Sequence, residues 1–240
     1  MRDLGIGPRR RFGAAPGYSP LAAFGADTEL WLDAADTGTR YLAAVGGAPA
    51  GSTDPCGAWA DKSGKLDGGA PRHATQGTAS MRPTCTASAL AFDGGDNIVT
   101  PAFAASAPPN TLAIVGRVTN NGGALVDGSA PRTIVSRGAN AATYTVHNGL
   151  SLTAGAASPD LSARRAFVAE FNGASSRSFV NNAPQASGNA GALGTSNLSI
   201  GGISGDFLVG EVCEVVLVGR LLTAQELAAL HAYFQAKWGL

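Results

Sequence analysis

Residues 207–218 read FLVGEVCEVVLV, a run of apolar and β-branched residues that is almost uninterrupted from Val212 onward. Glu211 and Glu214 are the charged residues of this run. A strand that is covered on both faces near the middle of a sheet has this composition, whereas a strand with one wet face alternates apolar and polar residues. We therefore expect residues 207–218 to form a central, buried strand.

The residues after this strand carry the signals of a helix. Thr223 can cap the first turn, and Glu226, three residues later, completes the pattern of a capping box. Apolar side chains then recur at steps of three or four residues, at Leu227, Leu230, Phe234 and Trp238. The pattern predicts a C-terminal helix that packs an apolar stripe on a sheet.

From residue 28 up to this strand, short apolar runs alternate with turn-forming residues. The runs are rich in Val, Ile, Thr and aromatic residues, which suit strands. The connecting sequences can supply the positive φ angles of tight hairpins: NNGG at 120–123, DG at 127–128, NG at 148–149 and 172–173, and NN at 181–182. This pattern predicts an all-β chain of antiparallel hairpins.

The overall composition excludes several classes of protein. The chain has 240 residues, with 17 basic and 17 acidic side chains and a formal net charge of zero. Nucleic-acid-binding proteins need a basic surplus, so no nucleic-acid partner is expected. No window reaches the roughly 18 consecutive apolar residues of a membrane-spanning helix, so no membrane partner is expected either. No apolar segment follows the N-terminal arginines, so no secretory signal is predicted and synthesis in a cytoplasm is expected.

Residues 1–27 differ from the rest of the chain, because glycine and proline interrupt a basic stretch without helical or strand periodicity. The basic residues of this segment are Arg2, Arg9, Arg10 and Arg11. We interpret residues 1–27 as an extended arm and residues 28–240 as one domain. The arginines suit anchoring on an acidic protein surface, with a solubilising tail or a nucleic-acid contact as alternatives.

Several short motifs occur in an order that resembles a known family. They are LWLDA at 30–34, WADKSG at 59–64, ATQ at 74–76, RPT at 82–84, FDG at 92–94 followed by Asp96, and GEVCEV at 210–215 with the helix after it. Together they resemble the concanavalin A-like jelly-roll domains of the laminin-G type, common in bacterial and bacteriophage proteins. The resemblance implies an antiparallel jelly-roll β-sandwich, here with an extended N-terminal arm and a short C-terminal α-helix.

Catalytic chemistry finds little support in the sequence. Glycoside cleavage needs two carboxylates on one face, but Glu211 and Glu214 are three residues apart and would point to opposite faces of a regular strand. They also miss the E-x-D-x-x-E pattern of catalytic relatives. We expect Glu214 to be satisfied by backbone groups or an arginine, and Glu211 to be exposed.

The three histidines are scattered, without the order of a triad or a zinc site: His73, His147 and His231. The sequence therefore predicts no catalytic residue and a non-enzymatic chain.

Glycan binding would use aromatic rings that stack on sugars, with amides nearby to bind hydroxyl groups. The candidate residues are Asn120, Asn121, Tyr144, Asn181 and Asn182. Further aromatic candidates are Tyr41, Phe103 and Phe207.

Asp93 and Asp96 offer hard oxygen ligands for calcium, although an Asx-stabilised turn explains the same residues without an ion. No other cofactor is predicted.

The chain has three cysteines, Cys56, Cys85 and Cys213. Because they are odd in number and widely spaced, we interpret them as small buried hydrophobic residues. A single bridge between Cys56 and Cys85 remains open.

The sequence leads to a main functional hypothesis and an alternative. The first is a structural or decoration component of a bacteriophage or phage-like virion, in a capsid, tail or fibre. It would be made in the host cytoplasm, anchored to other virion proteins by its arm, and present in many copies or as a homo-oligomer. The alternative is a lectin-like adhesion module that binds polysaccharides of the host surface.

Overall fold

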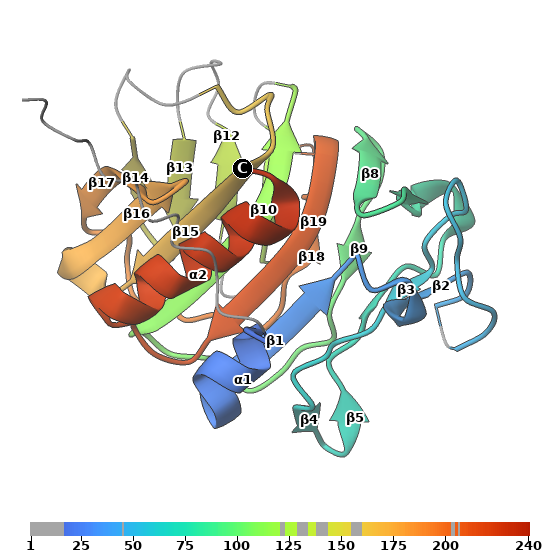
Figure 1. Ribbon diagram of the computed structural model, residues 1–240, viewed down its shortest axis with the longest axis horizontal. Coiled ribbons are helices and arrows are strands. Elements are labelled where there is room, and N and C mark those ends of the chain that lie inside the picture. Colours follow the sequence, from blue (N-terminus) through green and yellow to red (C-terminus); the bar gives the residue numbers. More distant parts are fainter. Residues whose placement is uncertain are drawn as a thin grey trace, which may run out of the picture.

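The computed structural model describes residues 17–44, 46–120, 123–128, 134–137, 144–154, 160–202, 205 and 207–240. Two large antiparallel sheets face each other, and a C-terminal helix lies across the outer face of one of them (Figure 1). The all-β prediction with a C-terminal helix is therefore confirmed. The four arginines of the predicted arm and Asn121 lie outside the described residues.

Sheet A carries the helix. Its strands run in the order β17 (Ala183–Gly188), β16 (Ser176–Val180), β15 (Arg165–Phe171), β10 (Asn110–Val118), β19 (Val209–Val218), β8 (Leu90–Asp93) and β7 (Thr84–Cys85), with β1 (Thr28–Asp33) also paired to β19. Strand β19 is central, as predicted. It pairs with β10 along one side, while its other side pairs with β8 over the first half and with β1 over the second half.

Sheet B forms the opposite layer. Its strands run in the order β14 (Ser151–Thr153), β13 (Tyr144–His147), β12 (Ile134–Arg137), β11 (Ala124–Asp127), β18 (Ser199–Ile200), β9 (Ile98–Val99), β6 (Ala74–Thr75), β3 (Ala58–Trp59) and β2 (Arg40–Tyr41). A separate hairpin of β4 (Leu66–Asp67) and β5 (Ala70–Pro71) stands beside it. Short 3₁₀ turns complete the chain: η1 (Gly25–Asp27), η2 (Thr37–Thr39), η3 (Ala79–Met81) and η4 (Gly173–Ser175).

Two apolar layers hold these elements together. The main core lies between the sheets and is lined by alternate residues of their strands, such as Val212, Val215 and Leu217 of β19. The second layer lies between sheet A and the helices, and it uses the other face of the same strand, at Val216 and Val218. Because both faces of β19 are buried, its continuous apolar sequence is explained.

Helix α2 (Ala224–Trp238) begins with the capping box that the sequence predicted. Thr223 accepts a hydrogen bond from the Glu226 N–H, and the Glu226 carboxylate accepts one from the Thr223 N–H. The predicted apolar stripe is buried on sheet A. The stripe also includes His231 and Tyr233, which the spacing rule did not single out.

The folded structure begins before residue 28, where the arm was predicted to end. Helix α1 (Pro20–Phe24) starts at Ser19, whose hydroxyl accepts a hydrogen bond from the Ala22 N–H. Phe24 is buried in the layer below α2, and the ring of Tyr18 packs on Tyr233 with the centroids 5.1 Å apart. This end of the predicted arm is therefore fastened to the sandwich, because its two aromatic residues have an apolar surface to cover. No helix of the described segments is long and apolar enough to span a bilayer.

Candidate functional site

Glu214 is fully buried between sheet A and α2. Its carboxylate accepts hydrogen bonds from the indole Nε1 groups of Trp31 and Trp238 and the hydroxyl of Tyr233, each at 2.8 Å, and from Nζ of Lys237 at 3.0 Å. Burial raises the pKa of Glu214, while Lys237 opposes this shift. Glu214 is satisfied within the protein, but the predicted partners are wrong: they are two indoles, a phenol and a lysine rather than backbone groups or an arginine. This carboxylate fixes α2 on the sheet.

Glu211 is not exposed as predicted, because two arginines cover it. Nη2 of Arg117 lies 2.9 Å from its carboxylate and Nη2 of Arg164 lies 3.0 Å away. The pairing of β10 with β19 shifts between Val115 and Gly116, so β19 carries an extra residue there. Such a bulge resets the alternation of side chains.

This bulge brings Glu211 and Glu214 to the same side of sheet A. Arg164, the partner of Glu211, also lies over the ring of Trp238, which donates to Glu214. The predicted arrangement on opposite faces is therefore wrong. Both carboxylates are occupied by cationic or N–H and O–H partners within the protein.

The histidines do not converge on one site. Nδ1 of His73 accepts a hydrogen bond from the Asp61 N–H, and Nδ1 of His147 lies 3.2 Å from the Ser151 hydroxyl. His231 is buried beneath α2, and neither of its ring nitrogens has a hydrogen bond in the described structure.

The predicted glycan-binding residues are mostly engaged in structural contacts. Tyr144 is 1% exposed and its ring packs on Phe167 in the core, so it offers no surface to a sugar. The Asn120 side-chain amide hydrogen-bonds to the backbone at the start of β19. It donates to the Phe207 carbonyl and accepts from the Val209 N–H.

The Asn181 and Asn182 pair forms the turn between β16 and β17, with φ angles of 47° and 67°. Asn181 Oδ1 accepts a hydrogen bond from the Ala166 N–H, and Asn182 is exposed. Because β10 and β16 run in the same direction on either side of β15, this turn and Asn120 lie at the same end of sheet A.

The candidate calcium ligands Asp93 and Asp96 form a turn. Asp93 Oδ1 accepts a hydrogen bond from the Gly95 N–H, and Asp96 Oδ2 accepts one from the Asp93 N–H. Burial and the neighbouring Asp93 carboxylate raise the pKa of Asp96 to about 6. Within the described residues, no group of three or more His, Cys, Asp or Glu side chains could hold a metal ion. The geometry is that of an Asx-stabilised turn.

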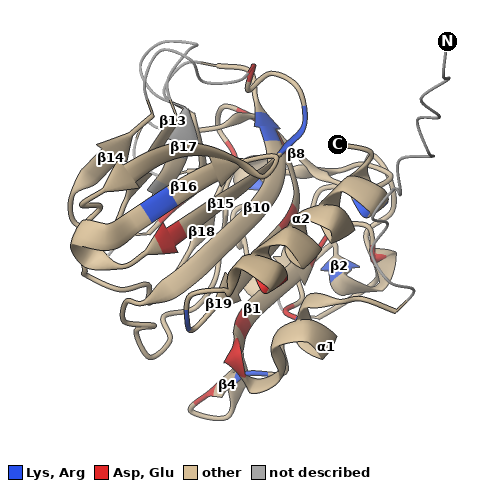
Figure 2. Ribbon diagram, turned by 60° about the vertical axis from the view of Figure 1, so that its left-hand side comes forward, with Lys and Arg blue, Asp and Glu red and all other residues tan. Residues whose placement is uncertain are grey.

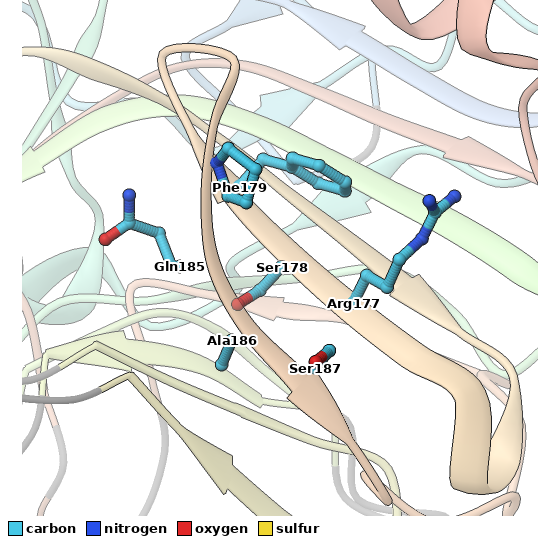
Figure 3. Close-up of a pocket in the computed structure, with 7 residues that line it drawn as sticks. Arg177, Ser178, Phe179, Gln185, Ala186 and Ser187 are labelled. Carbon is cyan, nitrogen blue, oxygen red and sulfur yellow. The ribbon is translucent and has the colours of Figure 1, made fainter.

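A shallow pocket of about 340 Å³ lies on the β16–β17 hairpin (Figure 3). We call it the hairpin pocket, lined by Arg177, Ser178, Phe179, Pro184, Gln185, Ala186 and Ser187. Arg177 and Phe179 project from one side of the hairpin and Gln185 from the other. Nη2 of Arg177 lies 2.5 Å from the carboxylate of buried Glu170 on the next strand. Figure 2 shows a basic segment on β16 and an acidic segment beside it in the same sheet. Glu170 neutralises the guanidinium, and the Phe179 ring is only 7% exposed.

A larger pocket of about 540 Å³ lies on the outer face of sheet B. We call it the sheet B pocket, lined by Tyr41, Ala44, Gly46, Ala58, Ala70, Pro71, His73, Thr75 and Pro101. Its floor is a cross-strand row in which Tyr41 faces Ala58 and Ala58 faces Thr75. The alternate residues, Trp59 and Ala74, point into the core.

The wall of the sheet B pocket is the β4–β5 hairpin, which Arg72 holds in place. Arg72 pairs with the carboxylates of Glu29 and Asp67, and its guanidinium lies over the ring of Phe103 at 4.4 Å. On this wall, His73 uses Nδ1 as an acceptor, which leaves Nε2–H as the donor of a neutral imidazole. The floor of the pocket thus offers the Tyr41 ring and the Thr75 hydroxyl on either side of Ala58, and His73 adds a ring N–H donor.

Of these pocket residues, the sequence suggested only Tyr41. His73 and Thr75 were missed as a site, because they lie on and beside a strand of two residues, which is too short for a periodic signal. In the structure, the segment PRHAT at 71–75 alternates exposed or half-buried residues with buried ones, but one of the buried residues is the charged Arg72, so the sequence does not show this alternation.

No protein-family model and no curated protein matches the chain. Solved structures do match. A sialidase of Trypanosoma rangeli in complex with sialic acid is 18% identical, with a TM-score of 0.60 over 88% of this chain and 33% of the sialidase chain. The binding domain of botulinum neurotoxin serotype D in complex with N-acetylneuraminic acid is 10% identical, with a TM-score of 0.53 over 89% of this chain and 52% of the other.

These matches establish a β-sandwich fold that the chain shares with other proteins. The chain spans about one third of the sialidase and about half of the toxin structure. The prediction that the chain is not an enzyme is contradicted by the comparison, because sialidases are enzymes in which this fold occurs. That prediction also relied on Glu211 and Glu214 facing opposite sides of the sheet, and the bulge in β19 removes this ground.

Proposed function

We propose that the chain is a carbohydrate-binding module and that the sheet B pocket is its binding site. The observation that carries the proposal is the combination of Tyr41 and Thr75 in the open floor of the pocket with His73 beside them. An aromatic ring stacks on the apolar face of a sugar, while an N–H donor and a hydroxyl bind its oxygen atoms. The hairpin pocket lacks this combination, since its ring is buried and its cation is already paired.

The structural neighbours support the same function. Both the sialidase and the toxin binding domain are described in complex with sialic acid, so the shared sandwich is compatible with binding of an acidic sugar. The Nε2–H of His73 suits the carboxylate of such a sugar as well as a hydroxyl. Sialylated oligosaccharides are therefore the first ligands to test.

The comparisons favour carbohydrate binding over the virion component that the sequence suggested. The jelly-roll topology of the laminin-G type, the attachment of an N-terminal arm to other virion proteins and the multi-copy assembly stay as proposals. Deletion of residues 1–17 tests the attachment of the arm: the truncated chain should still fold but no longer copurify with phage particles, and unchanged copurification would contradict it.

The binding site is tested with a glycan array, followed by titration calorimetry on the best glycan. We expect saturable binding, and a loss of affinity of about 5- to 30-fold for Tyr41→Ala, because one stacking contact and its buried area contribute about 1–2 kcal/mol. Gln185→Ala in the hairpin pocket is the matched control and should bind like the parent chain. A flat array of sialylated and neutral glycans contradicts the function. Loss of binding in Gln185→Ala but not in Tyr41→Ala contradicts the site.

A further inference from the structure

Two cysteines lie on backbone segments that pair with each other. The Cys56 N–H donates to the Pro83 carbonyl and the Cys85 N–H donates to the Asp54 carbonyl, each at 2.8 Å. An antiparallel bridge between Pro55 and Thr84 lies in the middle of this pairing. Residues that oppose each other in an antiparallel pair project on the same side, and so do residues two apart on one strand. Cys56 opposes Pro83, and Pro83 and Cys85 are two residues apart on the same segment. Cys56 and Cys85 therefore project on the same side, as diagonal neighbours.

The two thiols share one buried environment. Cys56 is 0% and Cys85 is 1% exposed, and both belong to the core between the sheets. The Sγ of Cys56 donates a hydrogen bond to the Ala58 carbonyl at 3.2 Å. Interaction with the Cys85 thiol, together with burial, raises the pKa of Cys56, and the interaction with Cys56 lowers the pKa of Cys85. Cys213 lies in the other apolar layer, between sheet A and α2. Of the three cysteines, only this pair is arranged for a bond.

We propose that Cys56 and Cys85 form a disulfide when the chain folds in the presence of a small-molecule disulfide such as oxidised glutathione. Cys85, as the thiolate, attacks one glutathione sulfur and releases one glutathione thiolate. Cys56 then loses its proton and attacks the Cys85 sulfur, which releases the second glutathione thiolate. Two protein thiols lose two electrons, one glutathione disulfide gains them, and the two protons pass to the released thiolates. Since both cysteines are buried in the folded chain, the exchange takes place before the core closes.

The bond would close a loop that carries most of the sheet B pocket. Residues 57–84 contain strands β3 to β6 and the pocket residues Ala58, His73 and Thr75. A crosslink across such a loop lowers the entropy of the unfolded chain and so stabilises the folded one.

The test is refolding of the full chain from denaturant, with one sample in a mixture of oxidised and reduced glutathione and one in excess reductant. Free thiols are then alkylated under denaturing conditions and counted by intact mass. We expect one labelled thiol in the oxidised sample and three in the reduced one. A peptide that joins Cys56 to Cys85 should appear in a non-reducing digest. The Tm of the oxidised sample should be about 5–10 °C higher.

Two variants control for other chemistry. Cys213→Ala should keep the crosslinked peptide and the rise in Tm, and Cys85→Ala should lose both. Three labelled thiols after oxidative refolding, or a disulfide that includes Cys213, would overturn the proposal. A crosslink without any rise in Tm would contradict the loop-closure argument. The experiment does not involve glycan binding, so its failure is independent of the proposed function.

Discussion

We expect the buried histidine of α2 to make the stability of this protein sensitive to mild acid. His231 is 2% exposed, and its ring nitrogens have no hydrogen-bond partner among the described residues. Its ring meets that of Phe179 edge to face, with the ring centroids 6.5 Å apart. Burial without a partner penalises the charged imidazolium and lowers the pKa of His231 to about 4. The unfolded chain keeps a histidine pKa near 6.5.

The sign of the effect follows from these two values. The folded state binds the proton less tightly than the unfolded state, so the contribution of His231 is fully present above pH 6.5. It is lost as the pH falls from 6.5 toward 4. The whole difference corresponds to about 3 kcal/mol, of which about 2.5 kcal/mol is lost by pH 4.5.

The substitution that isolates this term is His231→Leu, which fills a similar volume and cannot titrate. Urea unfolding at pH 7.5 and pH 4.5 gives the drop in unfolding free energy for each chain. We expect the drop to be about 2.5 kcal/mol smaller in His231→Leu than in the parent chain. His147→Gln on β13 is the control and should leave the drop almost unchanged. Equal drops in the parent chain and in His231→Leu would refute the assignment of this acid sensitivity to His231.

Three further outcomes follow from the structure. Asp96→Asn should stabilise the protein at pH 7 by about 1–2 kcal/mol, because the raised pKa of Asp96 means that its carboxylate is unfavourable in the fold. This gain should shrink as the pH falls from 6 toward 4. Urea midpoints across this pH range measure the gain, and a variant that is destabilised at pH 7 contradicts the prediction. Glu214→Gln should lower the unfolding free energy by about 3 kcal/mol, because it removes the negative charge and places an NH2 donor against the Lys237 ammonium and the Trp238 indole N–H. Denaturation followed by tryptophan fluorescence reports the loss, and a change below 1 kcal/mol argues against a network that fastens α2. Gly191→Ala should lower the unfolding free energy several times more than Gly64→Ala. Both glycines have a positive φ, but only a Cβ at residue 191 would lie 2.2 Å from a backbone oxygen. Equal melting temperatures for the two variants would show that this close approach is absent.

Local patterns in the sequence were enough to predict β19 and α2. The apolar run from Val212 reports burial on both faces, and the spacing from Thr223 onward reports a capped amphipathic helix. Both signals depend on neighbours within a few residues of each other. The tertiary structure therefore keeps the strand and the helix that these signals predict, although it adds a bulge within β19.

Features that depend on distant partners were not predictable in the same way. The bulge in β19 arises from pairing with β10, and no residue near Cys213 marks it in advance. Tyr144 looks like a surface aromatic in a run that contains His147, yet its ring fills the core against Phe167.

The sheet B pocket could not be predicted from the sequence either, because it also depends on residues that are distant in the chain. Its floor is assembled from strands of two residues that come from different parts of the first hundred residues, and each is too short to show alternation on its own. The row becomes visible only when Tyr41, Ala58 and Thr75 are placed in register.

The position of β19 has a consequence for the order in which the chain can fold as it is synthesised. Leu30 on β1 faces Leu217 and Leu90 on β8 faces Val212, while Leu112 on β10 also faces Leu217. Until the ribosome has delivered β19, these three earlier strands have no hydrogen-bonding partner along the edges that meet it. The nascent chain thus exposes unpaired apolar strand edges until β19 is made, and β19 then pairs with β1, β8 and β10.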